Sequence, residues 1–256
     1  EGPFWENESL YEKAPDSEST TWMNFGGDKV WPAPQSGWQH IAPTNWPPPV
    51  GFDATPVEAD INGWEVTLIS PIDPNFGIRT RRHIVLEPGR AQMTITTTFV
   101  KVNGAPLNTS IWTLTQLKNP VGIYSPTAVM TGFLEGFMLL AGERPPSLKV
   151  TDGILSLTRD PKKPHKIGLD AHTLLWAGQE SMLIINSPRI VSADYPEKGS
   201  SIAVETVPDP QGYVSLETMG PMQRVIPGDT MERRSTYRLL RRTELEPDLD
   251  VQKLLD

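Results

Sequence analysis

The 256-residue sequence contains no cysteine, so disulfide scaffolds, thiolate metal sites and cysteine nucleophiles are excluded. No stretch of 18 apolar residues occurs, and we expect no membrane insertion. Basic residues are fewer than acidic ones, 23 against 31, and the resulting net charge of −8 argues against a nucleic-acid partner. The first residues, EGPFWENES, lack a signal-peptide pattern. The composition is that of an ordered chain that can bury a substantial core.

Several common catalytic motifs are also missing. The sequence has no Gly-rich phosphate loop, no HExxH, no GxSxG and no EF-hand loop. Its four histidines, His40, His83, His165 and His172, do not have the spacing of a ligand pair. We therefore predict neither a metal site nor a cofactor, and we interpret these histidines first as surface or loop residues.

The chain divides into a loop-rich beginning, residues 1–60, a strand-rich part, residues 61–242, and an acidic tail, residues 243–256, within one domain. The first part carries nine prolines and five of the eight tryptophans. Proline removes backbone donors, so this part cannot supply many central strands. Its tryptophans distinguish it from a disordered tail, and we expect long loops packed over a sheet.

Two-residue alternation of apolar and polar side chains dominates from Trp64 onward and predicts many short strands. Turn sequences predict where these strands pair. We expect hairpins at Asn103-Gly104 and at Asp152-Gly153, and a further strand pair formed by 174–177 and 181–186. Only Met130–Ala141 and the tail Glu244–Asp256 have helical character. The predicted fold class is all-β, a sandwich or barrel with little helix.

The loop from Asn24 to Gln35 combines paired glycines with acidic, basic, aromatic and amide side chains. Such a mixture suits a polyhydroxylated ligand, because aromatic rings stack on sugar C–H faces while carboxylates and amides bond hydroxyls. The candidate sugar-binding residues in this loop are Asp28, Lys29, Trp31 and Gln35. An equally plain reading is that Trp31 fills the core and that Asp28 and Lys29 form an exposed ion pair.

Three segments resemble the DUF4380 family of bacterial proteins, namely GGDKVWPAPQSGW (26–38), SIWTLTQLKNP (110–120) and YVSLETMGPMQRVIPGD (213–229). That family is similar to the galactose mutarotase-like, or aldose 1-epimerase-like, superfamily. The resemblance covers about residues 20–240 and implies a β-supersandwich fold. Members usually open with two or three strands before the Gly-Gly loop, so we expect that this sequence either lacks a preceding portion or has lost an edge of the sheet.

The resemblance implies a chemistry in which a glutamate acts as base and a histidine as acid to open and reclose a sugar ring. Glu217 is the first candidate base, because alternation puts it with Tyr213 and Ser215 on a polar strand face. Glu205, on the preceding strand, is the second carboxylate candidate. The family's histidine is absent from the strand around Trp112, which leaves His83 and His172 as candidate acids. For either glutamate, a solvated strand carboxylate is the alternative.

Three further residues complete the predicted sugar site. Trp112 and Gln116 share a strand face and suit ring stacking and hydroxyl recognition. Arg81 is one of three arginines on one predicted strand, with Arg79 and Arg82. Such a group suits binding of an acidic or phosphorylated sugar, or else it solubilises an exposed strand.

These residues predict a carbohydrate-binding protein with a sugar or sugar derivative as its ligand. An aldose 1-epimerase-like enzyme using a Glu base is one reading, and a non-catalytic carbohydrate-binding module is the other. A purely structural sandwich is a third, disfavoured by the tryptophan-rich loop. Carbohydrate-handling proteins without cysteine are often exported, which favours a periplasmic or extracellular location.

Overall fold

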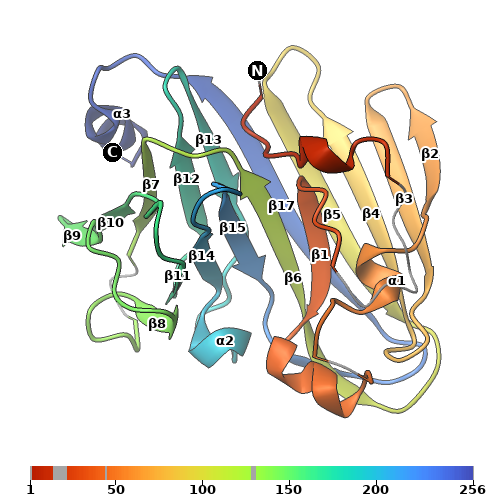
Figure 1. Ribbon diagram of the computed structural model, residues 1–256. Coiled ribbons are helices and arrows are strands. Elements are labelled where there is room, and N and C mark those ends of the chain that lie inside the picture. The colour runs from red at the N-terminus through yellow and green to blue at the C-terminus, as the bar shows by residue number, and fades with distance from the viewer. Residues whose placement is uncertain (1, 14–21, 44, 128–130, 256) are drawn as a thin grey trace.

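The computed structural model describes residues 2–13, 22–43, 45–127 and 131–255, which form two antiparallel sheets that lie face to face (Figure 1). Strands account for 46% of the chain and helices for 10%, so the all-β prediction is confirmed. Among the described residues, none of the helices combines the length and apolar character that crossing a bilayer requires.

The seven-stranded sheet carries the candidate site. In spatial order, with β16 attached to β6, it contains β1 (Asp28–Ala33), β6 (Leu107–Leu117), β15 (Val214–Met219), β14 (Ile202–Thr206), β11 (His165–Leu169), β8 (Met138–Ala141) and β16 (Gln223–Val225).

The ten-stranded sheet forms the second layer. In order it contains β2 (Glu58–Asn62), β3 (Glu65–Ile72), β4 (Ile78–Leu86), β5 (Gln92–Lys101), β17 (Thr230–Arg241), β13 (Ser181–Asn186), β12 (Thr173–Ala177), β7 (Gly122–Pro126), β10 (Ile154–Leu157) and β9 (Lys149–Thr151). The helices in the described residues are short: η1 (Glu8–Leu10), η2 (Gln35–His40), α1 (Val50–Asp53), α2 (Pro196–Gly199) and α3 (Pro247–Leu255).

Alternation along the strands decides which side chains enter the space between the sheets. Val214 and Leu216 of β15 pack there with Leu183 and Ile185 of β13 in the largest apolar cluster. Residues 213, 215, 217 and 219 therefore point to the outer face of the seven-stranded sheet, away from the ten-stranded one.

One buried polar cluster also joins the two sheets. The Asp28 carboxylate of β1 pairs with Arg82 of β4, and it accepts hydrogen bonds from Thr115 of β6 at 2.6 Å and from Tyr237 of β17 at 2.8 Å. These partners satisfy the carboxylate inside the sandwich, where an unpaired charge would be strongly destabilising.

Several hairpins form as the sequence predicts. Asp152-Gly153 closes the β9–β10 hairpin, and β12 pairs with β13. The predicted helix in the tail is confirmed as α3, although Asp256 lies outside the described residues.

Two predictions about elements are wrong. Asn103-Gly104 does not close a hairpin, because β5 pairs with β4 and β17 whereas β6 belongs to the other sheet. Residues 131–141 are not helical; they form a loop followed by strand β8, which pairs with β11, while Met130 lies outside the described residues.

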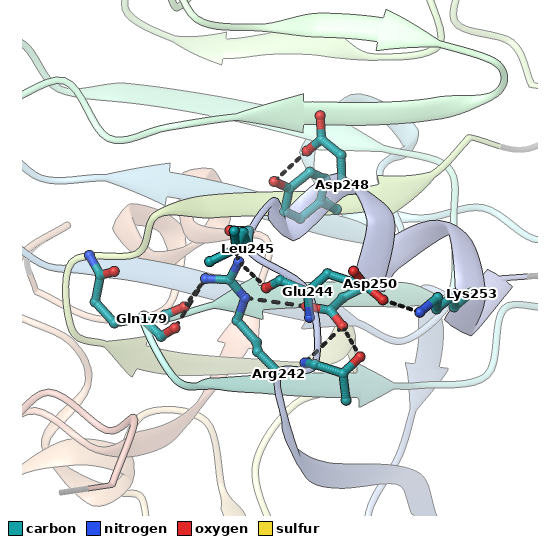
Figure 2. A network of polar contacts seen from close by, with 10 residues as sticks. Gln179, Arg242, Glu244, Leu245, Asp248, Asp250 and Lys253 are labelled. Carbon is teal, nitrogen blue, oxygen red and sulfur yellow. Dashed lines mark hydrogen bonds and ion pairs between the residues drawn. The ribbon is translucent and has the colours of Figure 1, made fainter.

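A dense polar network holds α3 against the ten-stranded sheet (Figure 2). Arg242 donates to the carbonyl oxygens of Gly178, Gln179, Glu244 and Leu245 and contacts Asp250. Asp250 in turn accepts from the backbone N–H groups of Thr243 and Glu244 and from the Thr243 hydroxyl. The arginine and aspartate together fix the turn between β17 and α3.

Candidate functional site

Glu217 lies in the middle of β15 on the outer face of the seven-stranded sheet and is completely buried. Its neighbours across the sheet are Leu114 of β6 on one side and Ala203 of β14 on the other. The sequence predicts this face for Glu217 but not its burial, which results from the side chains that fold over it.

The two carboxylate oxygens of Glu217 have different surroundings. Oε2 accepts a hydrogen bond from Trp112 Nε1 at 2.9 Å and lies 3.0 Å from Lys166 Nζ. Oε1 has no hydrogen-bond partner among the described residues. The carboxylate is thus anchored through one oxygen, while the other is buried without a hydrogen-bond partner in the described part of the chain.

Burial raises the pKa of Glu217 to about 7, with the Lys166 ammonium opposing this shift and Glu205 adding to it. For Lys166, burial acts to lower the pKa, but the Glu217 and Glu205 carboxylates outweigh it and raise the pKa. Lys166 therefore remains charged, while Glu217 changes protonation near neutrality. A carboxyl with this behaviour suits proton transfer at pH 7.

Lys166 connects Glu217 to the surface. Its Nζ lies 4.7 Å from the centre of the Trp112 ring and 3.9 Å from Glu205, whose side chain is 40% exposed. The direct cross-strand pair of Lys166 with Glu205 sets this arrangement, because paired residues point to the same side of a sheet.

Two further side-chain oxygens beside Glu217 have no partner in the described part of the chain. Ser215 Oγ and Gln116 Oε1 are buried and unbonded, and these residues lie directly opposite each other on β15 and β6. Ser215 is two residues from Glu217 and shares its face. Unbonded acceptors this close together can bind the hydroxyl groups of a ligand or water.

A tryptophan cluster covers the same face next to Trp112. The rings of Trp31 and Trp38 meet Trp112, and Trp22 and Trp46 meet Trp31. Trp31 is 3% exposed and Trp112 is 2% exposed. The two predicted stacking residues are thus buried against neighbouring rings, and Gln116 is buried as well.

The remaining residues predicted from the first loop separate from one another. Asp28 points between the sheets to Arg82, whereas Lys29 lies 3.7 Å from Asp53 of α1. Gln35 begins η2 and is partly exposed. Asp28 and Lys29 therefore have different ion-pair partners, both partly or fully enclosed, and they do not form an ion pair with each other.

The structure does not bring the candidate acids to Glu217. His83 lies on β4 of the other sheet, where its ring nitrogen meets Glu65 at 3.0 Å, and Arg81 is exposed on the same strand face. His172 is exposed in the loop between β11 and β12. The described residues contain no cluster of three or more histidines and carboxylates that could hold a metal ion.

Lys166 is the site residue that the sequence reasoning missed. It follows His165 in a short strand, and the signal that could have found it is its alternation with the buried Ile167 and its pairing register with Glu205. Register between strands 39 residues apart depends on the whole sheet, so the single sequence does not reveal it.

Comparison with known proteins places this geometry in a known fold. A structure from Escherichia coli K12, provisionally assigned as an aldose 1-epimerase, matches with a TM-score of 0.55 at 11% identity, over 74% of this chain and 70% of that chain. A provisionally assigned mutarotase from Salmonella typhimurium matches with a TM-score of 0.52 at 12% identity, over 94% and 80%. The fold is that of the galactose mutarotase-like proteins.

The comparisons support the fold and no finer assignment. A provisionally assigned aldose 1-epimerase from Klebsiella pneumoniae also matches, with a TM-score of 0.50 at 10% identity over 79% of this chain and 59% of that chain. No protein-family model matches the sequence. No curated protein matches it either.

Proposed function

We propose that the protein binds carbohydrate on the outer face of the seven-stranded sheet and interconverts aldose anomers, with Glu217 as the base. The observation that carries this proposal is a carboxylate with one anchored oxygen, one free oxygen and a pKa of about 7. The mutarotase-like fold supports it, and so does the resemblance of residues 26–38, 110–120 and 213–229 to the DUF4380 family.

The proposed reaction needs two proton transfers. Glu217 takes the proton of the anomeric hydroxyl through Oε1 while the bond between the anomeric carbon and the ring oxygen breaks, and the ring oxygen takes a proton from an acid. Lys166 is the charged donor beside Glu217 and occupies the role proposed for a histidine in the resemblance. After rotation about the bond to the new carbonyl group, the same steps in reverse close the ring on the other face.

The charges around Lys166 indicate the class of sugar. Glu217 and Glu205 both lie within 4 Å of its ammonium group, so carboxylates outnumber cations there. A phosphorylated sugar would meet repulsion from these carboxylates, whereas a neutral aldose would not. Ser215 and Gln116 offer their free acceptors to its hydroxyl groups. We therefore propose a neutral aldose as substrate.

The test compares anomer interconversion by exchange NMR in the wild type and in Glu217→Gln. The variant keeps the shape of the side chain but cannot accept the proton, so the catalysed rate should fall roughly 10²–10⁴-fold. Glu58→Gln, on the exposed edge strand β2, is the matched control and should keep the wild-type rate. A wild type that never exceeds the spontaneous rate on neutral aldoses would overturn the epimerase proposal.

A second candidate is a non-catalytic carbohydrate-binding module. One observation favours it, namely that both candidate acids, His83 and His172, lie away from Glu217. This module should bind a neutral sugar, measured by calorimetry, with no effect on anomer exchange. Because Trp112 bonds Glu217, such binding should also change tryptophan fluorescence, and the change should be smaller in Glu217→Gln.

A further inference from the structure

A cavity of about 200 Å³ lies at the free edge of β1, away from Glu217. It is lined by residues of β1, of β3 and β4 in the other sheet, and of α1. Figure 1 shows where these elements lie in the fold. The residues that matter here are Asp28, Lys29, Asp53, Ser70, Thr80 and Arg82. We call this space the β1-edge cavity.

Close backbone contact fixes α1 as one wall of the β1-edge cavity. A Cβ added to Gly51 would lie 2.7 Å from the Cα atom of Asp73, so only glycine allows α1 to sit this near the residue that follows β3. The Gly51 backbone N–H also donates to the Asp73 carboxylate at 3.1 Å. The wall is therefore built into the fold.

The acidic groups at the β1-edge cavity already have their hydrogen-bond donors. Both Asp53 oxygens accept from tryptophan ring nitrogens, Oδ1 from Trp31 at 3.0 Å and Oδ2 from Trp22 at 2.7 Å. Both Asp28 oxygens are likewise taken by Arg82 and by the Thr115 and Tyr237 hydroxyls. Neither carboxylate needs a further donor.

Arg82 donates through Nη1 to the Asp28 backbone oxygen and through Nη2 to its carboxylate, but other donors at the same cavity lack an acceptor. Arg82 Nε and Thr80 Oγ1 are buried and have no hydrogen-bond partner among the described residues. These residues are two apart on β4 and share a face, and Thr80 is 5% exposed. The Lys29 ammonium is 3.7 Å from Asp53 and makes no hydrogen bond within the described ranges.

We propose that the β1-edge cavity is a second binding site, which takes a small oxyanion, a carboxylate or a phosphate group. The ligand should be rich in hydrogen-bond acceptors, because Arg82 Nε, Thr80 Oγ1 and the Lys29 ammonium group have no hydrogen-bond acceptor among the described residues. The carboxylate oxygens of Asp28 and Asp53, in contrast, already accept hydrogen bonds. An anion receives charge-assisted hydrogen bonds from the guanidinium and ammonium groups, which are about twice as strong as neutral ones. A volume near 200 Å³ admits acetate or inorganic phosphate and excludes an oligosaccharide.

The test is an amide NMR titration with sodium acetate and, separately, with sodium phosphate, at constant ionic strength set by chloride. Saturable shifts should be centred on residues 51–53 and 80–82. Tighter acetate binding identifies a carboxylate site, and tighter phosphate binding a phosphate site. No sugar is present, so the outcome is independent of the function proposed for Glu217.

Two variants show whether the identified donors hold the anion. Thr80→Val keeps the shape and removes the hydroxyl, and it should weaken binding roughly 10-fold or more, as expected for a lost bond to a charged group. The control Thr96→Val lies opposite His83 on β5 and should bind like the wild type. If Thr80→Val destabilises the fold, Arg82→Lys, which keeps the charge and loses Nε–H, provides the same comparison. Absence of saturable shifts, or equal binding by Thr80→Val and Thr96→Val, would overturn the proposal.

Discussion

Glu217 is a carboxylate that the fold holds near its point of titration. Its environment disfavours the charged form through burial, and Lys166 limits this effect at a distance of 3.0 Å. The balance between these two opposing influences sets a pKa of about 7. Removing the lysine charge would shift the balance toward the neutral acid, so the lysine keeps the carboxyl useful at neutral pH.

This balance predicts that stability depends on pH in a defined direction. Between the ordinary pKa of 4.5 and the folded value of about 7, the native state binds more protons at Glu217 than the unfolded state does. Stability from this group is therefore full below pH 4.5 and falls as the pH rises through 7, by up to about 3 kcal/mol. Urea unfolding at a series of pH values should show this fall in the wild type and a flatter profile in Glu217→Gln. Parallel profiles would contradict the prediction.

At the level of single residues, the sequence predicts the strand face of Glu217 but not its partners. Alternation in 213–217 is a local property, so the face follows from the pattern alone. The contacts with Trp112 and Lys166 join strands 105 and 51 residues away, and the tryptophan cover comes from the first loop. Residue types therefore predict polar and aromatic character, whereas exposure depends on long-range packing.

The N-terminal strap, residues 4–7, is an element that closes one end of the candidate site. Trp5 stacks on Tyr213 at 4.4 Å, and its carbonyl oxygen accepts from the Gly27 backbone N–H at 2.9 Å. Gly26 makes this approach possible, because it has φ of +90° and an added Cβ would lie 2.2 Å from the Trp5 oxygen. The strap thus depends on a glycine at position 26.

Gly26→Ala should release the strap. The added methyl group clashes with the Trp5 carbonyl, and we expect a loss of roughly 1–3 kcal/mol together with faster proteolysis within residues 4–13. Gly27→Ala is the matched control, since its φ is +75° but no atom lies within 4 Å of the new Cβ. Gly27→Ala should lose only the stability that a non-glycine residue loses at positive φ, and the strap should stay in place. Equal protease sensitivity of the two variants would show that the clash is relieved elsewhere.

The C-terminal helix α3 is the second element held by a single cluster. Burial acts to raise the pKa of Asp250, but hydrogen bonds from Thr243, Glu244 and Arg242 outweigh it and lower the pKa (Figure 2). The stabilisation is therefore present above the ordinary pKa of 3.8 and is lost as the pH falls through the lower folded value.

Asp250→Asn should loosen α3 and leave the sheets intact. The loss of a charged acceptor for several donors costs roughly 1–3 kcal/mol, and amide exchange should accelerate in residues 247–255 while β13 and β17 keep their protection. Lys253→Gln, in the same helix, removes an ion pair with Glu244 of the preceding turn and should have little effect. Unchanged exchange in α3 of Asp250→Asn would contradict the role given to this residue.

Among the elements, hairpins closed by short turns can be predicted from the sequence, whereas the places where the chain passes from one sheet to the other cannot. Asp152-Gly153 gives a β9–β10 hairpin because both strands stay in one sheet. Asn103-Gly104 has an equally strong turn sequence, yet the chain leaves the ten-stranded sheet there and enters the other. A turn sequence specifies a change of direction and not the sheet that the next strand joins. Residues 131–141 show the related ambiguity of a short apolar run, which fits a helix or a buried strand.

At the scale of the whole molecule, the Asp28 cluster fastens one sheet to the other. Burial raises the pKa of Tyr237, which therefore remains a neutral hydroxyl donor to Asp28. Together with Arg82 and Thr115 it connects β1 and β6 to β4 and β17.

Tyr237→Phe should lower the stability of the whole protein by about 2 kcal/mol, because Asp28 loses a donor in a buried position. The expected measurement is a lower midpoint in differential scanning calorimetry with a single transition. Tyr11→Phe, whose residue is 62% exposed and bonds Glu6, should shift the midpoint little. A comparable shift in both variants would mean that the inter-sheet bond contributes no more than a surface contact.

The path of the chain between the two sheets bears on how quickly the protein folds. Strands of the seven-stranded sheet come from residue 28 to residue 225, and strands of the ten-stranded sheet from residue 58 to residue 241, with the two sets interleaved. In each sheet the last strand follows the first by most of the described chain, so neither sheet can be completed by a short contiguous segment. Folding must bring together segments far apart in sequence, and loop closure of that kind is slow. Until β17 is added, β5 and β13 each have an unpaired side, and we expect the folding chain to be most open to aggregation at that stage.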